Sequence, residues 1–281
     1  MGAEPLVWRA KDIEWELRRT LVMGVLNVTP DSFSDGGRFT DERAAVERGI
    51  QIADEGADLI DVGGESTRPG AQPVPADEEW RRIGGVIAGV HRRSAIPISV
   101  DSRKPEVAAK ALEAGAVVVN DVGGLQDPAM ARLVAESGSA AVIMHMRGDP
   151  ATMQADPRYD DVVAEVRAFL ARQFASAVTA GVAREAIVLD PGIGFGKTPG
   201  HNVELLRGLE TVRGLGRPVL VGVSRKSFLA KVHPKGDTRR LEASLATTGF
   251  AVQHGADIVR VHDVGETVRY VRMLDSLLGR G

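Results

Sequence analysis

Polar residues that could bind a small ligand follow short apolar runs along most of the sequence. Arg260 and His262 stand two apart in the run IVRVH, so on a strand their side chains share one face and could clamp an anion. Spacing alone leaves it equally open that Arg260 pairs with a nearby carboxylate and that His262 is a core histidine. Donors and acceptors at many other strand ends favour a ligand site and suit a flat heterocycle with amide and amidine edges. These further residues are Asn27, Asp61, Glu65, Asp101, Asn120, Asp121, His145, Asp190, Ser224, Arg225 and Lys226.

The glycine-rich segment PGIGFGKT, residues 191–198, does not match a standard phosphate-binding loop. Such a loop needs a glycine five residues before its Gly-Lys pair, and Pro191 holds that position. The dinucleotide-binding fingerprint fails as well, because its third glycine would be Lys197. We interpret these glycines as a sharp turn between a strand and a helix, at which a ligand can approach the backbone closely.

Two other chemistries stay open on the residues alone. Lys226 could form a Schiff base, but such a lysine needs an apolar pocket or a cationic neighbour, and Arg225 supplies only the second. The six histidines are scattered, which disfavours a histidine-rich metal centre, and we interpret His145 as structural. A hard ion held by oxygen atoms, Mg²⁺ above all, remains an option near Asn27 and Asp35.

The elements that must position these residues are eight apolar runs that alternate with helical patterns. The runs are rich in β-branched residues, which is typical of strands buried on both faces of a parallel sheet. They lie at residues 21–28, 59–63, 96–100, 117–120, 141–145, 187–190, 219–223 and 258–262, and the predicted helices at 43–55, 77–93, 105–114, 128–136, 160–180, 202–209, 241–254 and 266–278. Eight strands, each followed by a helix, predict an α/β fold of the (β/α)₈ TIM-barrel type, although periodicity does not exclude an open doubly wound sheet.

We expect residues 1–281 to form a single barrel domain, because a barrel of this kind takes about 250 residues and no linker interrupts the chain. Residues 1–20 carry Trp8 and Trp15 and predict a short β-hairpin that plugs the bottom of the barrel. The connections 29–40 and 64–76 are longer than usual βα loops. Long loops in compact folds tend to be lids or binding segments, so we expect two mobile active-site loops here.

The composition excludes several classes of protein. A formal charge of -3 and 4 % aromatic residues disfavour nucleic-acid binding, which needs a basic excess and stacking side chains. No apolar run approaches the ~20 residues needed to cross a bilayer, and the first residues are too charged for a secretory signal, so we expect a cytoplasmic protein without a membrane segment. The absence of cysteine rules out disulfides, thiolate metal sites and a cysteine nucleophile.

Eight segments, in order along the chain, are similar to the motifs of the dihydropteroate synthases, a family of pterin-binding TIM barrels. The first two are highly specific, whereas the last alone would mean little, and no motif position departs from the family pattern. The likeness covers essentially the whole barrel, but residues 1–20 carry no diagnostic motif. The segments are MGVLNVTPDSFSDGG (23–37), DVGGESTRPGA (61–71), ISVDSRKPEVA (98–108), VNDVGG (119–124), IMHMRGDPATMQ (143–154), LDPGIGFGKT (189–198), VGVSRKSFL (221–229) and RVHDV (260–264).

The resemblance implies a transferase of folate biosynthesis. It would condense 6-hydroxymethyl-7,8-dihydropterin diphosphate with 4-aminobenzoate to give 7,8-dihydropteroate and diphosphate. It also implies a dissociative mechanism, in which the C–O bond breaks first and leaves a pterin carbocation, so that stabilising the cation and the departing diphosphate matters more than a base. The residues implied as catalytic are Asp101, Lys226, Arg260 and His262.

The resemblance also implies which residues contact each ligand. It implies pterin contacts at Asp101, Asn120, Met144, Asp190, Gly222 and Lys226. Diphosphate contacts are implied at Asn27, Thr67, Arg68, Arg260 and His262, with Mg²⁺ shared by Asn27 and Asp35. For 4-aminobenzoate they are Phe33, Thr67, Arg68, Pro69, Phe195 and Ser227. The two loops would become ordered only when diphosphate is present and would exclude water from the cation.

The resemblance leaves two alternative functions to weigh and also implies an assembly and a class of competitors. A catalytically silent paralogue that binds pterin would have the same sequence features. A corrinoid-linked methyltetrahydrofolate methyltransferase shares the pterin-binding barrel but has no use for a diphosphate clamp or for the two specific loops. Family members are usually homodimers, and sulfonamides, which mimic aminobenzoate, should compete for its site.

Overall fold

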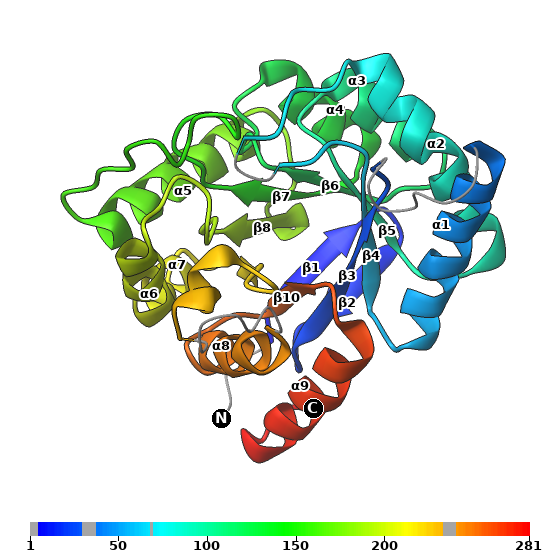
Figure 1. The fold of residues 1–281 in the computed structure, drawn as a ribbon. Coiled ribbons are helices and arrows are strands. Elements are labelled where there is room, and N and C mark those ends of the chain that lie inside the picture. Colours follow the sequence, from blue (N-terminus) through cyan, green and yellow to red (C-terminus); the bar gives the residue numbers. More distant parts are fainter. Residues whose placement is uncertain (1–4, 30–37, 68–69, 233–239) are drawn as a thin grey trace.

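A barrel of eight parallel strands forms the centre of the computed structural model, which describes residues 5–29, 38–67, 70–232 and 240–281 (Figure 1). Neighbouring strands follow the order β8-β7-β6-β5-β4-β3-β10-β9. A parallel bridge between Leu189 and Val219 joins the two ends of this order and closes the barrel, which excludes the open sheet. The strands are β3 (Leu21–Asn27), β4 (Leu59–Gly63), β5 (Ile98–Asp101), β6 (Val118–Asp121), β7 (Ala140–Met144), β8 (Ile187–Asp190), β9 (Leu220–Val221) and β10 (Ile258–Val261).

Helices connect the strands and surround the barrel (Figure 1). The eight predicted helices are present, and a short helix, α7, and two 3₁₀ segments, η2 and η3, are added to them. The predicted strand 219–223 is shorter in the structure, because the chain turns at Val223, whose carbonyl accepts a hydrogen bond from Lys226 N at 3.3 Å. The helical elements are α1 (Arg38–Asp54), α2 (Ala76–Arg93), α3 (Pro105–Glu113), α4 (Pro128–Ser137), α5 (Val162–Thr179), η2 (Arg184–Ala186), α6 (Pro199–Arg207), α7 (Leu209–Arg213), η3 (Ser227–Val232), α8 (Leu241–Gln253) and α9 (Val264–Leu277).

Local sequence signals explain where the elements begin and end. All five residues of β4 are buried, as expected for a strand with the barrel interior on one side and helices on the other. Helix α4 begins at Pro128 behind the cap Asp127, whose carboxylate accepts from Ala129 N at 2.8 Å, and it ends at Gly138, which has a φ of 63°. Within the described residues, no helix is long and apolar enough to cross a membrane.

The N-terminal hairpin of β1 (Val7–Ala10) and β2 (Ile13–Glu16) lies across the N-terminal ends of the strands. Trp8 is fully buried, stacks on Trp15 with ring centroids 4.5 Å apart and donates Nε1–H to Ala186 O, just before β8. Lys11 N donates to Gly138 O, just before β7, and Arg217, just before β9, donates to Val7 O. The predicted hairpin is therefore present, at the bottom of the barrel where we expected it.

The two long connections are described to different extents. In the first, residues 30–37 lie outside the described residues. In the second connection, residues 68–69 lie outside the described residues. The rest of this connection is held by the Glu65 carboxylate, which accepts from Val74 N at 3.0 Å and from the Lys104 ammonium. Arg82 also donates to Gly64 O at 2.9 Å. The mobility of these loops stays a prediction.

We predict that Trp8→Ala lowers the free energy of unfolding by about 3–5 kcal/mol, because it removes a large buried side chain and leaves a cavity between hairpin and barrel. Chemical unfolding followed by circular dichroism measures the change. Glu14→Ala, on the exposed side of the same hairpin, is the control and should cost less than about 1 kcal/mol. Equal effects of the two variants would contradict a role of the hairpin in holding the barrel together.

Candidate active site

A hollow lies where the C-terminal ends of the strands converge, which is where TIM barrels place their chemistry. Nine of its eleven lining residues were candidates from the sequence. The other two, Val122 and Ile193, are apolar residues that closely follow polar strand ends, and this adjacency was the signal that could have found them. The lining residues are Thr67, Asp101, Asn120, Val122, Met144, Asp190, Ile193, Phe195, Gly222, Lys226 and Arg260.

The Arg260 guanidinium joins two carboxylates across the hollow. Its Nε donates to Asp61 Oδ2 at 2.6 Å and its Nη2 donates to Asp101 Oδ2 at 2.7 Å. Asn120 Nδ2 donates to the same Asp61 oxygen at 2.9 Å, so strands β4, β5, β6 and β10 meet in one polar network. Asp61 is fully buried, and the sequence had listed it without a role. Arg260 therefore does pair with carboxylates, as spacing had left open, and of its two partners Asp101 lines the hollow whereas Asp61 does not.

Asp101 carries an oxygen that is ready for a ligand. Its Oδ1 is buried and has no hydrogen-bond partner among the described residues, although Oδ2 is paired with Arg260. A buried acceptor without a partner costs free energy unless a bound molecule supplies a donor. Burial raises the pKa of Asp101, and this desolvation outweighs the opposing attraction of the Arg260 guanidinium.

Asp190, at the end of β8, has its own backbone partner. Gly192 N donates to Asp190 Oδ1 at 2.7 Å, which fixes the carboxyl at the start of the glycine-rich turn. Burial raises its pKa to about 6, although Gly192 N–H, Lys226 and Lys197 act in the opposite direction. Asp190 is therefore ionised at neutral pH and can accept hydrogen bonds from a heterocycle.

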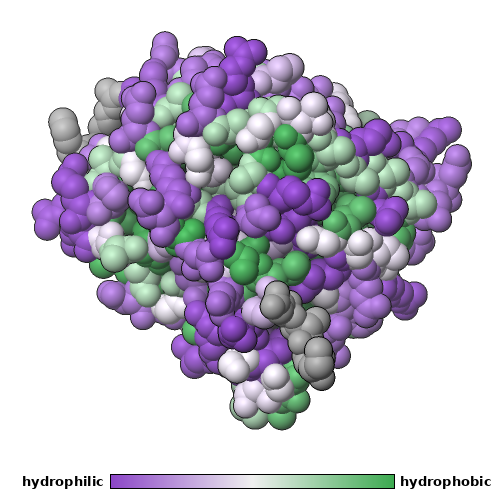
Figure 2. All heavy atoms as spheres, turned by 180° about the vertical axis from the view of Figure 1, so that it is seen from behind, coloured by the Kyte–Doolittle hydropathy of each residue, from purple (hydrophilic) through white to green (hydrophobic). Residues whose placement is uncertain are grey.

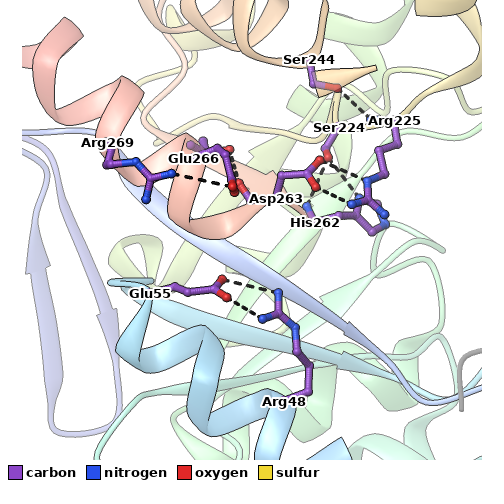
Figure 3. Close-up of polar contacts among 10 residues, drawn as sticks. Arg48, Glu55, Ser224, Arg225, Ser244, His262, Asp263, Glu266 and Arg269 are labelled. Carbon is purple, nitrogen blue, oxygen red and sulfur yellow. Dashed lines mark hydrogen bonds and ion pairs between the residues drawn. The ribbon is translucent and has the colours of Figure 1, made fainter. Parts of the chain in front are cut away.

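Lys226 reaches the hollow from the turn after β9. Its Nζ lies 4.0 Å from the centre of the Phe195 ring, and burial lowers its pKa to about 8, with Arg260 acting in the same direction. The preceding residue, Arg225, has a φ of 57°, a conformation unusual for a residue with a side chain. Ser244 Oγ accepts from Arg225 N at 3.1 Å, and Asp263 pairs with the Arg225 side chain, so tertiary contacts hold this turn in place (Figure 3).

His262 lies just beyond β10 and faces Ser224 (Figure 3). Its Nδ1 is 3.1 Å from Ser224 Oγ, and its backbone N–H also donates to that oxygen, at 3.2 Å. The His262 pKa is lowered to about 4, mainly by burial, with the nearby Arg260 and Arg225 acting in the same direction. The imidazole is therefore neutral at neutral pH, so it offers an anion a hydrogen bond rather than a positive charge.

Some predicted site residues lie apart from the hollow. Asn27, His262 and Ser227 do not line it: Asn27 ends β3, and Ser227 is exposed at the start of η3. The predicted residues outside the described part of the chain are Phe33, Asp35, Arg68 and Pro69.

Sequence reasoning missed a structural role for Lys197, which it had used only to reject a nucleotide fingerprint. This lysine is 2 % exposed and its Nζ lies 2.9 Å from His145 Nδ1. His145 is buried, as a structural histidine would be. A lysine that closes a segment with three alternating glycines was the available signal, because such a turn has inward-facing carbonyls that need a donor.

Comparisons with known proteins agree with this geometry. Residues 23–262 match the family described as pterin binding enzyme. The dihydropteroate synthase of Escherichia coli is 44 % identical over 269 residues, which are 96 % of this chain and 95 % of that protein. The solved structure of Xanthomonas albilineans dihydropteroate synthase with 4-aminobenzoic acid has a TM-score of 0.92 and 43 % identity, covering 99 % of this chain and 100 % of that one. That of the Yersinia pestis enzyme with a sulfonamide drug has a TM-score of 0.90 and 39 % identity, covering 98 % and 100 %.

We predict that affinity for a dihydropterin falls as the pH drops below about 6. The raised pKa means that Asp190 takes up a proton there, and a protonated carboxyl no longer accepts through both oxygens. Asp190→Asn keeps an oxygen for Gly192 N but turns a donor toward the ligand, so affinity should fall about 10- to 100-fold at pH 8, and the part of its pH dependence that comes from Asp190 should be lost. Calorimetric titrations of the unaltered protein and of the variant across this pH range measure the dihydropterin affinity. Unchanged affinity in the variant would refute the contact.

Proposed function

The chain belongs to the dihydropteroate synthases within the pterin-binding enzymes, and from this premise we propose how its residues carry out the reaction. The enzyme condenses 6-hydroxymethyl-7,8-dihydropterin diphosphate with 4-aminobenzoate, releasing diphosphate and 7,8-dihydropteroate. The single observation that carries the assignment of the hollow is that all six predicted pterin contacts line it: Asp101, Asn120, Met144, Asp190, Gly222 and Lys226.

The polar edge of the pterin meets fixed partners in this proposal. Asp101 Oδ1 and the Asp190 carboxylate accept from ring and amino N–H groups, and Lys226 donates to the ring carbonyl. The apolar side chains of Val122, Met144 and Ile193 cover the ring. An analogue with the wrong pattern would leave several buried groups unpaired, so discrimination between heterocycles is steep.

The same carboxylates support a dissociative first step. When the bond between the pterin methylene and the diphosphate oxygen breaks, positive charge spreads into the ring, and the electron pair leaves with the diphosphate. Asp101 and Asp190 place negative charge next to that cation in a buried site, where solvent screens it little. The aminobenzoate amine then forms the new C–N bond and loses a proton, so the chain needs no nucleophile of its own.

Arg260 has donors left for the diphosphate. Its Nε and Nη2 face Asp61 and Asp101, whereas Nη1 makes no hydrogen bond to another described residue. We assign this nitrogen to the leaving group, together with the neutral His262 imidazole. Thr67 lines the hollow at the start of the second long connection and completes the contact from the other side, with Arg68 beside it in sequence.

Mg²⁺ is the cofactor in this proposal, and Asn27 and Asp35 would hold it. The Asn27 side chain makes no hydrogen bond to another described residue, and an amide and a carboxylate oxygen are hard donors of the type that Mg²⁺ prefers. No cluster of three or more acidic or histidine side chains occurs in the described part of the chain, which does not include Asp35. When bound, Mg²⁺ would neutralise charge on the departing diphosphate.

The aminobenzoate site lies beside the pterin hollow in this proposal. Phe195 offers a ring face under the Lys226 ammonium, and Ser227, one residue further on, is exposed where a carboxylate could bind. Phe33, Thr67, Arg68 and Pro69 would close over it from the two long connections. A sulfonamide mimics aminobenzoate, so it should raise the KM for 4-aminobenzoate without changing the affinity for the pterin.

A homodimer is the assembly we propose, through helices on the outer surface. The large apolar side chains that a partner subunit would cover are exposed on α6, on α8, and on and just after α9: Val203, Phe250, Met273, Leu277 and Leu278. Apolar residues are visible at the lowest part of the molecule, where α9 ends (Figure 2). The cytoplasmic location expected from the sequence stays a prediction.

The decisive experiment is a turnover assay with the pterin diphosphate, labelled 4-aminobenzoate and Mg²⁺. Labelled dihydropteroate should form, and a chelator should abolish it until excess Mg²⁺ is restored. Product that persists in chelator would remove the metal from the proposal. Pterin binding without any product would instead indicate a silent paralogue.

We predict that His262→Ala weakens binding of the pterin diphosphate about fivefold, because one neutral hydrogen bond contributes roughly 1 kcal/mol. A dihydropterin without diphosphate should bind as tightly as to the unaltered protein and serves as the internal control. Calorimetry with the two ligands separates these effects. Equal losses for both ligands would place His262 at the ring and contradict its assignment.

A further inference from the structure

Lys197 is a buried lysine that the reaction scheme above does not use. It ends the glycine-rich turn, here defined as residues 192–197, and it is 2 % exposed. Its Nζ donates to Gly192 O at 2.9 Å and to Phe195 O at 3.0 Å, and it lies 2.9 Å from His145 Nδ1. An ammonium has three protons, so these three acceptors can satisfy it, and His145 O lies further away as a fourth acceptor at 3.4 Å.

The glycine-rich turn is folded around this ammonium and pressed against the end of β7. Gly192, Gly194 and Gly196 have φ values of 67°, 84° and 61°, a backbone conformation that other residues rarely adopt. A Cβ on Gly192 would lie 1.8 Å from His145 O, and one on Gly196 would lie 2.4 Å from Arg147 O. The turn can therefore sit against β7 only with glycine at these positions and with a donor to satisfy its carbonyls.

His145 provides the third acceptor because it is neutral. Burial lowers its pKa to about 3, and the Lys197 and Arg147 charges act in the same direction. In the neutral tautomer that carries its proton on Nε2, Nδ1 accepts from Lys197. The histidine ring is held in turn by Phe169, edge to face at 4.9 Å between centroids.

The glycine-rich turn carries parts of both substrate sites. Ile193 and Phe195 line the hollow, and the Phe195 ring lies under the Lys226 ammonium. At its start, Gly192 N fixes the Asp190 carboxyl. Lys197 does not itself line the hollow, so it can act there only through these residues and through its charge.

We propose that Lys197 is a positioning residue for both substrates: its ammonium closes the glycine-rich turn against His145 and thereby sets Phe195 for aminobenzoate and Asp190 for the pterin. The inference rests on the proposed assignment of the hollow. It predicts that removing one buried ammonium impairs two ligands that it does not touch.

The electrostatic part of this role has a distinct signature. The positive charge of Lys197 lowers the pKa of Asp190, and the Asp190 carboxylate in turn raises the pKa of Lys197. Burial and the repulsion of Lys226 and Arg147 act on the Lys197 pKa in the opposite direction. Burial lowers the pKa of Lys197 to about 7. Because a lost positive charge makes a nearby carboxyl harder to ionise, a neutral residue here moves the protonation of Asp190 to higher pH.

Lys197→Met tests the proposal, with Lys110→Met on the exposed face of α3 as the matched control. We expect the variant to raise the KM for 4-aminobenzoate and the dissociation constant of a dihydropterin about tenfold or more, with a smaller change in kcat. The fall of dihydropterin affinity toward low pH, here called the acid limb, should also begin at a higher pH. Lys197→Gln restores a donor without the charge, so it should recover part of the aminobenzoate KM while the acid limb stays shifted.

A folded Lys197→Met protein with both constants and the acid limb unchanged would overturn the proposal. If the Met variant does not fold, the Gln variant carries the test through the acid limb alone. The KM for 4-aminobenzoate requires turnover, but dihydropterin binding and its pH dependence are measured directly and do not. A wild-type protein that binds the pterin but makes no dihydropteroate would overturn the proposed function and leave the pterin part of the Lys197 inference to be tested by binding.

Discussion

The shared ion pair of Arg260 with Asp61 and Asp101 is the interaction on which the rest of the site depends. It connects β10 to β4 and β5, and through Asn120 to β6, so that four strands hold one polar network across the barrel. Two buried carboxylates without a cation would be strongly unfavourable, and one buried guanidinium without them equally so. The network is therefore stable only as a whole, and it leaves Asp101 Oδ1 and Arg260 Nη1 without a hydrogen bond to another described residue.

Burial sets the chemistry of these groups more than pairing does. The carboxyls of Asp101 and Asp190 have raised pKa values, while Lys226 and Lys197 have lowered ones, and in each group desolvation is the largest cause. A site of this kind interacts strongly with a charge that develops inside it, because little water screens the interaction. This suits a reaction that creates a cation and releases an anion. The lowered pKa of Lys226 would also suit a Schiff base, but the family membership and the pterin contacts that we propose favour a role in binding.

Besides the strands, two irregular turns position residues that line the hollow. Residues 192–197 use three glycines with positive φ and a buried lysine, and the turn after β9 uses Arg225 at a φ of 57°, held by Ser244 and Asp263. Both are local conformations that the chain would not adopt without tertiary contacts. Phe195 and Lys226 belong to different turns, and they meet only because each turn is held from outside the hollow.

By itself the sequence determined the barrel, its hairpin and most of the hollow. Period and β-branching mark buried parallel strands, and chemistry in this fold gathers at their C-terminal ends, so residues such as Asp101, Asn120 and Asp190 could be found from position alone. What only the tertiary structure decided is which polar groups pair with each other. The union of Arg260 with Asp61 spans 199 residues, and Lys197 finds His145 52 residues away. The pairing of buried charges depends on distances of a few ångströms and on the exclusion of water, and neither is a property of residue spacing along the chain.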